Sequence, residues 1–133
     1  MNNLINEVIK KTYSSNDLYI ALDEVSSECP FVGGCLVCAK SIIEFAGKGS
    51  LVRMVSDING GQTEHYGAMV DGVIYDFDGS ASSPQDWIER FQREEGVNRD
   101  MTFQEGYDEN SDIPDDPVVV KAITKLMFSF AKN

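Results

Sequence analysis

Residues 33–47 read GGCLVCAKSIIEFAG, and this segment governs how the rest of the chain is interpreted. The two glycines let the backbone turn tightly, and from Cys35 onward apolar residues recur every three or four positions, the period of an α-helix. Gly47 is a natural end for that helix, because glycine readily adopts the left-handed conformation of a C-cap. Since apolar residues lie on more than one side, we predict a central helix that begins at Cys35.

The elements predicted around this helix are helices over residues 2–11, 17–26, from 83 and from 117, and strands over residues 51–56, 64–70, 73–78 and 101–104. Asp71-Gly72 predicts a hairpin, because both residues tolerate a positive φ. Asp116 followed by Pro117 is typical of a helix start. The helix from residue 83 places Trp87 and Phe91 on one face, which is interpreted as core. Helices on both sides of a few antiparallel strands indicate an α+β fold, expected to form one domain over residues 1–133.

The composition is strongly acidic, with 22 Asp and Glu against 11 Lys and Arg and a net charge of -11. Such a surface repels phosphate backbones, so we expect no binding to nucleic acid. The acidic stretch over residues 108–116 is interpreted as a solvated loop. No stretch approaches the ~18 apolar residues of a membrane span, and the first residues lack the features of a signal peptide. We therefore expect a cytoplasmic protein with reduced cysteines and no association with membranes.

Cys35 is placed where a helix start can activate a thiol. The N–H groups in the first turn of a helix have no acceptor within the helix, and the helix dipole is positive at this end. Both effects favour a thiolate, and the same N–H groups can hold the oxyanion of a tetrahedral intermediate. We therefore predict that Cys35 is a reactive nucleophile.

His65 is the only histidine, so any cysteine–histidine catalysis must use it. It lies on a predicted strand, and Gly67 on the same face is expected to leave space for the central helix. With Asp71-Gly72 as the turn, Asp78 lies directly across from His65, and Asp76 lies one diagonal step away on the same face. Both aspartates are candidates for orienting the imidazole, and simple pairing favours Asp78.

Three segments together resemble a known enzyme family. Residues 34–43 read GCLVCAKSII, residues 65–70 read HYGAMV and residues 72–79 read GVIYDFDG. A cysteine that opens a helix, then a histidine at a strand start, then a Tyr-Asp-x-x-Gly element on the next strand, is similar to small papain-like, NlpC-type cysteine hydrolases of bacteria and phages. The resemblance covers residues 33–87.

This resemblance implies a papain-like fold, in which a central cysteine-bearing helix packs on a small antiparallel sheet with flanking helices. It implies that Cys35 is the nucleophile, His65 the general base and then acid, and Asp76 the orienting group. The resemblance thus favours Asp76 where pairing favours Asp78. It further implies cleavage of an amide, isopeptide or thioester bond in a peptide or protein substrate, with no metal or organic cofactor.

The segment before Cys35 departs from the family pattern. Papain-like enzymes usually carry a glutamine there whose side chain helps to form the oxyanion hole. In this chain residues 28–30 are Glu-Cys-Pro, and no glutamine or asparagine lies between Asp17 and Cys35. The alternative interpretation is a catalytically inactive papain-like protein that binds a protein partner through its acidic surface.

The other two cysteines are interpreted as structural. Cys38 lies one turn into the helix among apolar neighbours, which favours a core residue, and Cys29 is a structural thiol or a disulfide partner of Cys35. Cys35-x-x-Cys38 also has the spacing of a thioredoxin-like redox motif, and the three cysteines with His65 have the ligand types of a zinc site. Two helices precede the pair and no second CxxC or HxxxH follows, so we predict neither.

Overall fold

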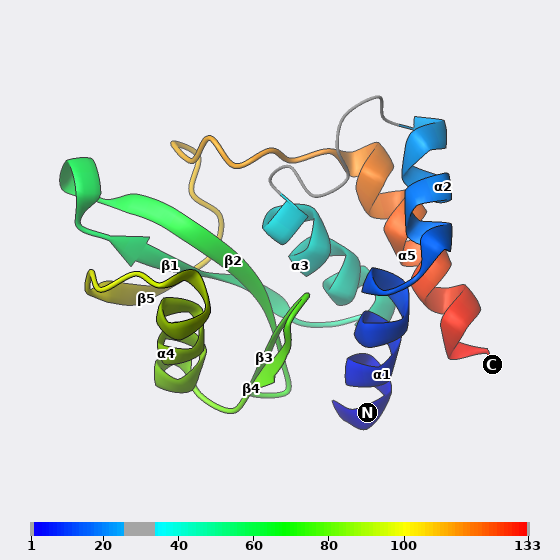
Figure 1. Ribbon diagram of the computed structural model, residues 1–133, viewed down its shortest axis with the longest axis horizontal. Helices are drawn as coiled ribbons and strands as arrows, with labels where there is room; N and C mark the ends of the chain where they lie inside the picture. The colour runs from blue at the N-terminus through cyan, green and yellow to red at the C-terminus, as the bar shows by residue number, and fades with distance from the viewer. Residues whose placement is uncertain (1, 26–33, 133) are drawn as a thin grey trace.

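The structure is a computed structural model that describes residues 2–25 and 34–132. In these residues the fold is α+β, as predicted, with one antiparallel sheet. The helices are α1 (Asn2–Tyr13), α2 (Asn16–Val25), α3 (Gly34–Ala46), α4 (Pro84–Glu95) and α5 (Pro117–Ala131); the strands are β1 (Ser50–Ser56), β2 (Gln62–Val70), β3 (Val73–Asp76), β4 (Gly79–Ala81) and β5 (Met101–Glu105), and a 3-10 turn, η1 (Ile58–Gly60), precedes β2. Figure 1 shows the sheet and α4 on one side of the molecule, α1, α2 and α5 on the other, and α3 between them.

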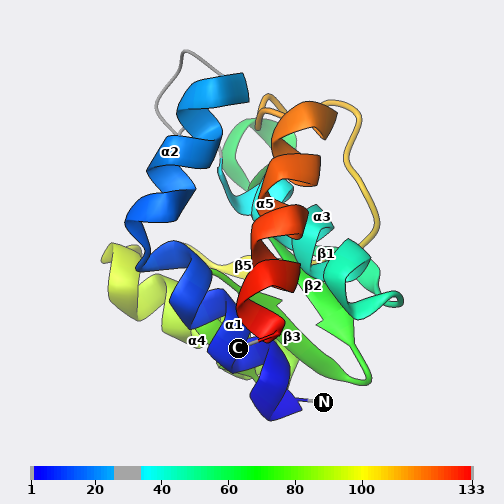
Figure 2. The same ribbon diagram turned by 90° about the vertical axis from the view of Figure 1, so that its right-hand side faces the viewer.

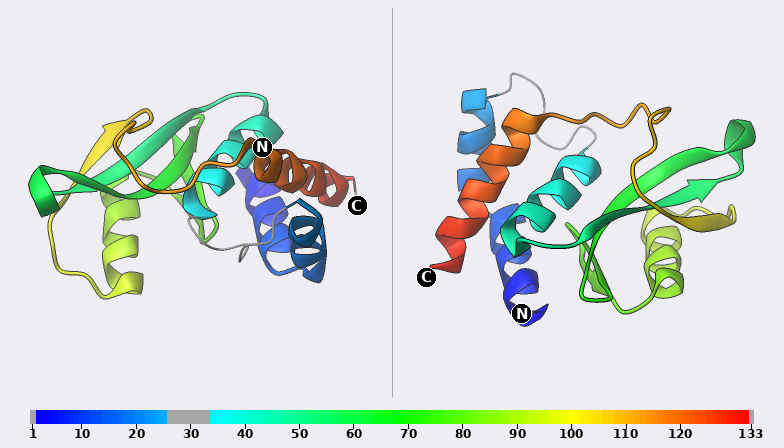
Figure 3. Two further views of the ribbon diagram at one scale, coloured as in Figure 1. Left: turned by 90° about the horizontal axis from the view of Figure 1, so that it is seen from above. Right: turned by 180° about the vertical axis from the view of Figure 1, so that it is seen from behind.

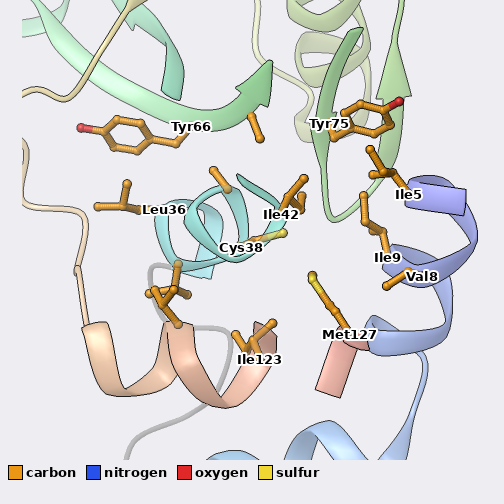
Figure 4. Packing of buried hydrophobic residues seen from close by; sticks show 14 of the residues in the cluster. Ile5, Val8, Ile9, Leu36, Cys38, Ile42, Tyr66, Tyr75, Ile123 and Met127 are labelled. Atoms are coloured by element: carbon orange, nitrogen blue, oxygen red, sulfur yellow. The ribbon is translucent and has the colours of Figure 1, made fainter. Parts of the chain in front are cut away.

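Helix α3 is the centre of the larger hydrophobic core, which confirms the prediction of a central helix. It contacts β2 on one side and α5 on the other. Leu36, Cys38 and Ile42 are completely buried, and Figure 4 shows them surrounded by apolar side chains of α1, α5 and the strands. Gly47 ends the helix with a φ of 74°, as expected for a glycine C-cap.

The sheet has the strand order β4-β3-β2-β1-β5, and each neighbouring pair is antiparallel. The predicted hairpin at Asp71-Gly72 is confirmed: Val70 pairs with Val73, and both turn residues have positive φ. The strand predicted over residues 73–78 was too long. The chain turns after Asp76 and returns as β4, a strand that is not among those predicted.

The two faces of the sheet are covered by different helices. The side chains on one face join the core around α3, and Figures 2 and 3 show α1 and α5 packed beside α3. On the other face α4 contacts β4 and β5, and its Trp87 packs in a smaller cluster with Val52 and Met54 of β1 and Ile74 of β3. The interpretation of Trp87 as a core residue is therefore confirmed. No helix in the described part of the chain is long and apolar enough to cross a membrane.

Local sequence signals fix the ends of α4 and α5. The Ser83 side chain accepts a hydrogen bond from the Asp86 N–H, and Asp116 caps α5 by accepting from two N–H groups of its first turn. A proline follows each cap, because the first turn of a helix does not need that N–H. The predicted starts of both helices are confirmed.

The acidic segment before α5 is attached to the body of the protein at two acidic residues. The Thr63 hydroxyl donates to the Asp108 carboxylate over 2.7 Å, and the Asp108 N–H donates to the Tyr66 hydroxyl. Lys40 on α3 pairs with Asp115 at 2.6 Å. Part of this acidic segment is therefore engaged with β2 and α3, in addition to being exposed to solvent.

Candidate active site

The structure brings Cys35, His65 and Asp76 together from three separate elements. Cys35 lies half-buried in the first turn of α3. His65 is in the middle of β2 and is only 5% exposed. Asp76 is the last residue of β3 and is 2% exposed. A buried imidazole next to a buried carboxylate is costly unless both are hydrogen-bonded, so their partners decide what the site can do.

The imidazole of His65 is held by Asp76 and lies near Cys35. Its Nε2 donates to the Asp76 Oδ2 over 2.9 Å. Cys35 lies close enough to raise the pKa of the ring, and because Nε2 is occupied by Asp76, Nδ1 is the nitrogen left for the sulfur. Burial lowers the pKa of His65, but the interactions with Asp76 and Cys35 outweigh this effect and raise that pKa from 6.5 to about 9.

Asp76, and not Asp78, is the carboxylate that reaches His65. The expectation from simple pairing was wrong because β3 ends at Asp76, so that Asp78 lies in the following turn and never comes across from the histidine. Asp78 instead donates its backbone N–H to the Asp76 Oδ1 over 2.9 Å. The turn that removes Asp78 from the strand thus supplies a bond that fixes Asp76.

Two side chains of α4 complete the environment of Asp76, and the sequence analysis did not identify this role for either. The Trp87 indole N–H donates to Oδ2 over 2.9 Å, and the Arg90 guanidinium donates to Oδ1 over 2.6 Å. Burial raises the pKa of Asp76, but the bonds and charges of His65, Arg90 and Trp87 together bring it below its ordinary value of 3.8. The available signal was the spacing of Trp87 and Arg90, which share one face of a helix.

Aromatic rings enclose the imidazole on its remaining sides. The Phe91 ring stacks on His65 with centroids 4.9 Å apart, and the Trp87 ring lies at 5.6 Å. Phe77 meets the imidazole edge-on at 5.8 Å. These rings exclude water from the His65–Asp76 bond, which strengthens it.

Gly67 serves a different purpose from the one predicted. A Cβ at this position would lie 2.7 Å from the Trp87 ring and 3.0 Å from Ile74. The space left by the missing side chain is therefore filled by α4 and not by the central helix. Glycine is required at this point of β2 because it lets the indole reach Asp76.

Cys38 is fully buried in the core beside Tyr13, which agrees with its interpretation as a structural residue. Burial raises the pKa of the Cys38 thiol far above its usual range. Cys29 lies outside the described residues, so its predicted role stays a prediction. Within the described parts of the chain, no group of three or more His, Cys, Asp or Glu side chains is placed to hold a metal ion.

A groove of about 580 Å³ adjoins the site. It lies between one face of α1 and the turn that joins β3 to β4, and its lining includes Asn6, Lys10, Tyr13, Phe77, Asp78 and Ser80. The Phe77 ring contacts His65 and also lines this groove. The groove therefore reaches the neighbourhood of the imidazole.

The arrangement combines the parts that thiol chemistry needs. A sulfur at a helix start adjoins an imidazole, and a carboxylate on the far side of that imidazole fixes its orientation. The chain matches no protein-family model, no curated protein and no solved structure.

Proposed function

We propose that the protein is a papain-like cysteine hydrolase of the NlpC type, which cleaves an amide, isopeptide or thioester bond in a peptide or protein. Cys35 is the nucleophile, His65 the general base and acid, and Asp76 the orienting group. The observation that carries the proposal is the buried imidazole of His65, which is bonded to Asp76 and feels the charge of the nearby Cys35. Their order along the chain and the packing of the cysteine helix on an antiparallel sheet support it.

The reaction proceeds in two steps. The Cys35 proton passes to His65, and the sulfur attacks the carbonyl carbon to form a C–S bond. The C–N bond then breaks, and the imidazolium gives its proton to the leaving amine. In the second step water attacks the thioester and gives a proton to His65, the C–S bond breaks, and the acid and the free cysteine are released. Asp76 keeps its negative charge throughout and holds the ring in position.

The oxyanion of each tetrahedral intermediate is assigned to backbone N–H groups at the start of α3. These groups have no acceptor within the helix, and they lie beside the attacking sulfur. This assignment replaces the side-chain donor that the sequence lacks before Cys35. The substrate is assigned to the groove beside Phe77, because the Phe77 ring also contacts His65.

The proposal is tested by the pH dependence of alkylation at Cys35. Iodoacetamide is added from pH ~5 to ~9, and peptide mapping by mass spectrometry measures the modification of each cysteine. An ordinary thiol, with a pKa of about 8.5, reacts slowly at pH ~6. In the native protein Cys35 is expected to react at least about tenfold faster at pH ~6 than in the His65→Ala variant.

Asp76→Asn and Asp78→Asn form the matched pair for this experiment, since both remove one negative charge from the same turn. Asp76→Asn is expected to abolish most of the faster alkylation of Cys35 at low pH, whereas Asp78→Asn is expected to keep it. If Cys35 in the native protein reacts at pH ~6 no faster than it does in His65→Ala, the hydrolase proposal fails. The catalytically inactive papain-like protein, which binds a partner through its acidic surface, would then be the better interpretation.

A further inference from the structure

The carboxylate of Asp76 is saturated with hydrogen bonds. The Asp78 N–H and Arg90 donate to Oδ1, while His65 and Trp87 donate to Oδ2. An ionised carboxylate has about four lone-pair sites, and four donors occupy them here. Of the four donors, Arg90 and His65 are the ones that can carry a positive charge.

Arg90 is held in place by two bonds of its own. Its Nη2 reaches Asp76 over 2.6 Å, and its Nη1 donates to the carbonyl of Ser80 over 3.0 Å. Its side chain is 15% exposed, so the ion pair is largely shielded from water. The planar guanidinium thereby connects α4 with β4 and fixes Asp76 at the end of β3.

We propose that Arg90 is a positioning residue of the Cys35 site: it fixes Asp76 and balances its charge, so that His65 can give up a proton without leaving a buried carboxylate unpaired. This inference rests on the proposed function, in which His65 alternates between its protonated and neutral forms. Without Arg90, the loss of the imidazole proton would leave Asp76 with no cation beside it, which is costly at a buried site.

The charged neighbours of His65 come from each element that packs near it. Cys35 comes from α3, Asp76 from β3, and Arg90 from α4. Farther out lies Glu94 on α4, whose pKa is raised by burial and by the charges of Asp78 and Asp76 and lowered by that of Arg90. Since Arg90 is a cation in a set rich in acids, the loss of its charge and the loss of its anchoring have opposite effects on the proton of His65.

This opposition makes the inference testable by NMR, because the only histidine in the chain gives a single imidazole titration. The spectra are recorded from pH ~5 to ~10 on the native protein and on Arg90→Gln, Arg90→Lys and Arg93→Gln. Arg93 lies on the exposed surface of the same helix, so its substitution removes an equal charge farther from Asp76.

Arg90→Gln is expected to raise the measured pKa of His65 by roughly 0.5 to 1, because a nearby positive charge is gone while glutamine can still donate to Asp76. Arg90→Lys keeps the charge and is expected to titrate close to the native protein, as is Arg93→Gln. A fall in Arg90→Gln toward the ordinary value of 6.5 would mean that Arg90 only anchors Asp76. A shift equal to that of Arg93→Gln would also overturn the inference.

The NMR readout separates this inference from the proposed function. If Cys35 fails the alkylation test but the titrations shift as expected, the hydrolase proposal falls and the charge balance stands. If Arg90→Gln does not fold, Arg90→Lys still decides the matter, because a large fall in its His65 pKa would contradict charge balance.

Discussion

The two faces of the β2–β3 hairpin follow the same alternation of side chains but bury different chemistry. The face toward α3 contributes residues to the apolar core: Tyr66, Ala68, Val70 and Tyr75. The face toward α4 carries His65 and Asp76, which are as well buried as the core but are polar. The first face needs only shape and volume, whereas the second is stable because the buried Asp76 carboxylate is fully hydrogen-bonded, in part to His65.

This difference predicts how each face tolerates change. Loss of volume in the apolar face weakens the fold, while the site can keep its geometry. Loss of one partner in the polar face leaves another buried group unpaired, so that the effect spreads to the whole network. The comparison can be tested by substitutions on the two faces that lower the free energy of unfolding by similar amounts.

The largest effect is expected for Trp87→Ala, which removes a fully buried ring and one donor to Asp76. The variant should lose about 3–5 kcal/mol in the free energy of unfolding, measured with urea, because a large cavity is created. The pKa of His65, measured by NMR, should fall, because water that enters the cavity screens the charge of Asp76, which raises that pKa in the native protein.

Two further variants are the controls for Trp87→Ala. Ile42→Ala, on α3, should lose about 2–5 kcal/mol for the same reason but leave the His65 pKa near its native value. Trp87→Phe keeps most of the ring and removes the N–H, at a cost of about 1–3 kcal/mol. If Ile42→Ala changed the titration of His65 as much as Trp87→Ala does, the two faces would not be independent.

The next effect is a dependence of stability on pH that comes from the polar face. The pKa of His65 is raised on folding, so its contribution is complete below pH 6.5 and is lost as the pH rises through about 9. That contribution is at most about 3 kcal/mol. The pKa of Asp76 is lowered below 3.8, so its contribution is present above that pH and is lost as the pH falls.

Stability should therefore be greatest between pH ~4 and ~6.5. Urea unfolding at pH ~6 and at pH ~8 measures the decline on the alkaline side, and His65→Gln should remove most of it. A native protein equally stable at both values would show that the imidazole does not gain its proton on folding.

The smallest effect is expected at Gly67, where the backbone of β2 meets α4. Gly67→Ala places a methyl group 2.7 Å from the Trp87 ring and should cost about 1–3 kcal/mol. Gly34→Ala is the control, because an added Cβ there meets nothing within 4 Å, and its stability should be equal or slightly higher. If Gly67→Ala were as stable as the native protein, the Trp87 indole would not lie against Gly67.

Much of the fold could be predicted because its signals are local. Asp71-Gly72, Gly47 and Asp116 each act on their own turn of chain, so the hairpin and the helix ends follow from nearest neighbours. The end of β3 could not be predicted in this way. Residues 73–78 continue the alternation of a strand. The chain turns after Asp76 because β3 pairs with the edge strand β4, whose sequence has no apolar pattern.

Part of the candidate site could also be predicted, because some of its signals are local. Cys35 and His65 were found from their place at a helix start and on a strand, and the choice of Asp76 came from a resemblance. The two α4 residues that bond to Asp76 were missed in that role, because they lie 11 and 14 positions from it along the chain. A helical period shows that Trp87 faces inward, but not which carboxylate it meets there.

The contact between His65 and Trp87 has a practical consequence. The chain contains one tryptophan and one histidine, and their ring centroids are 5.6 Å apart. A protonated imidazole quenches the fluorescence of an adjacent indole, so the emission of the unlabelled protein depends on the charge of this one ring. Because the chain has one tryptophan, indole emission excited apart from the tyrosines can follow proton exchange in this pair in real time, without a dye.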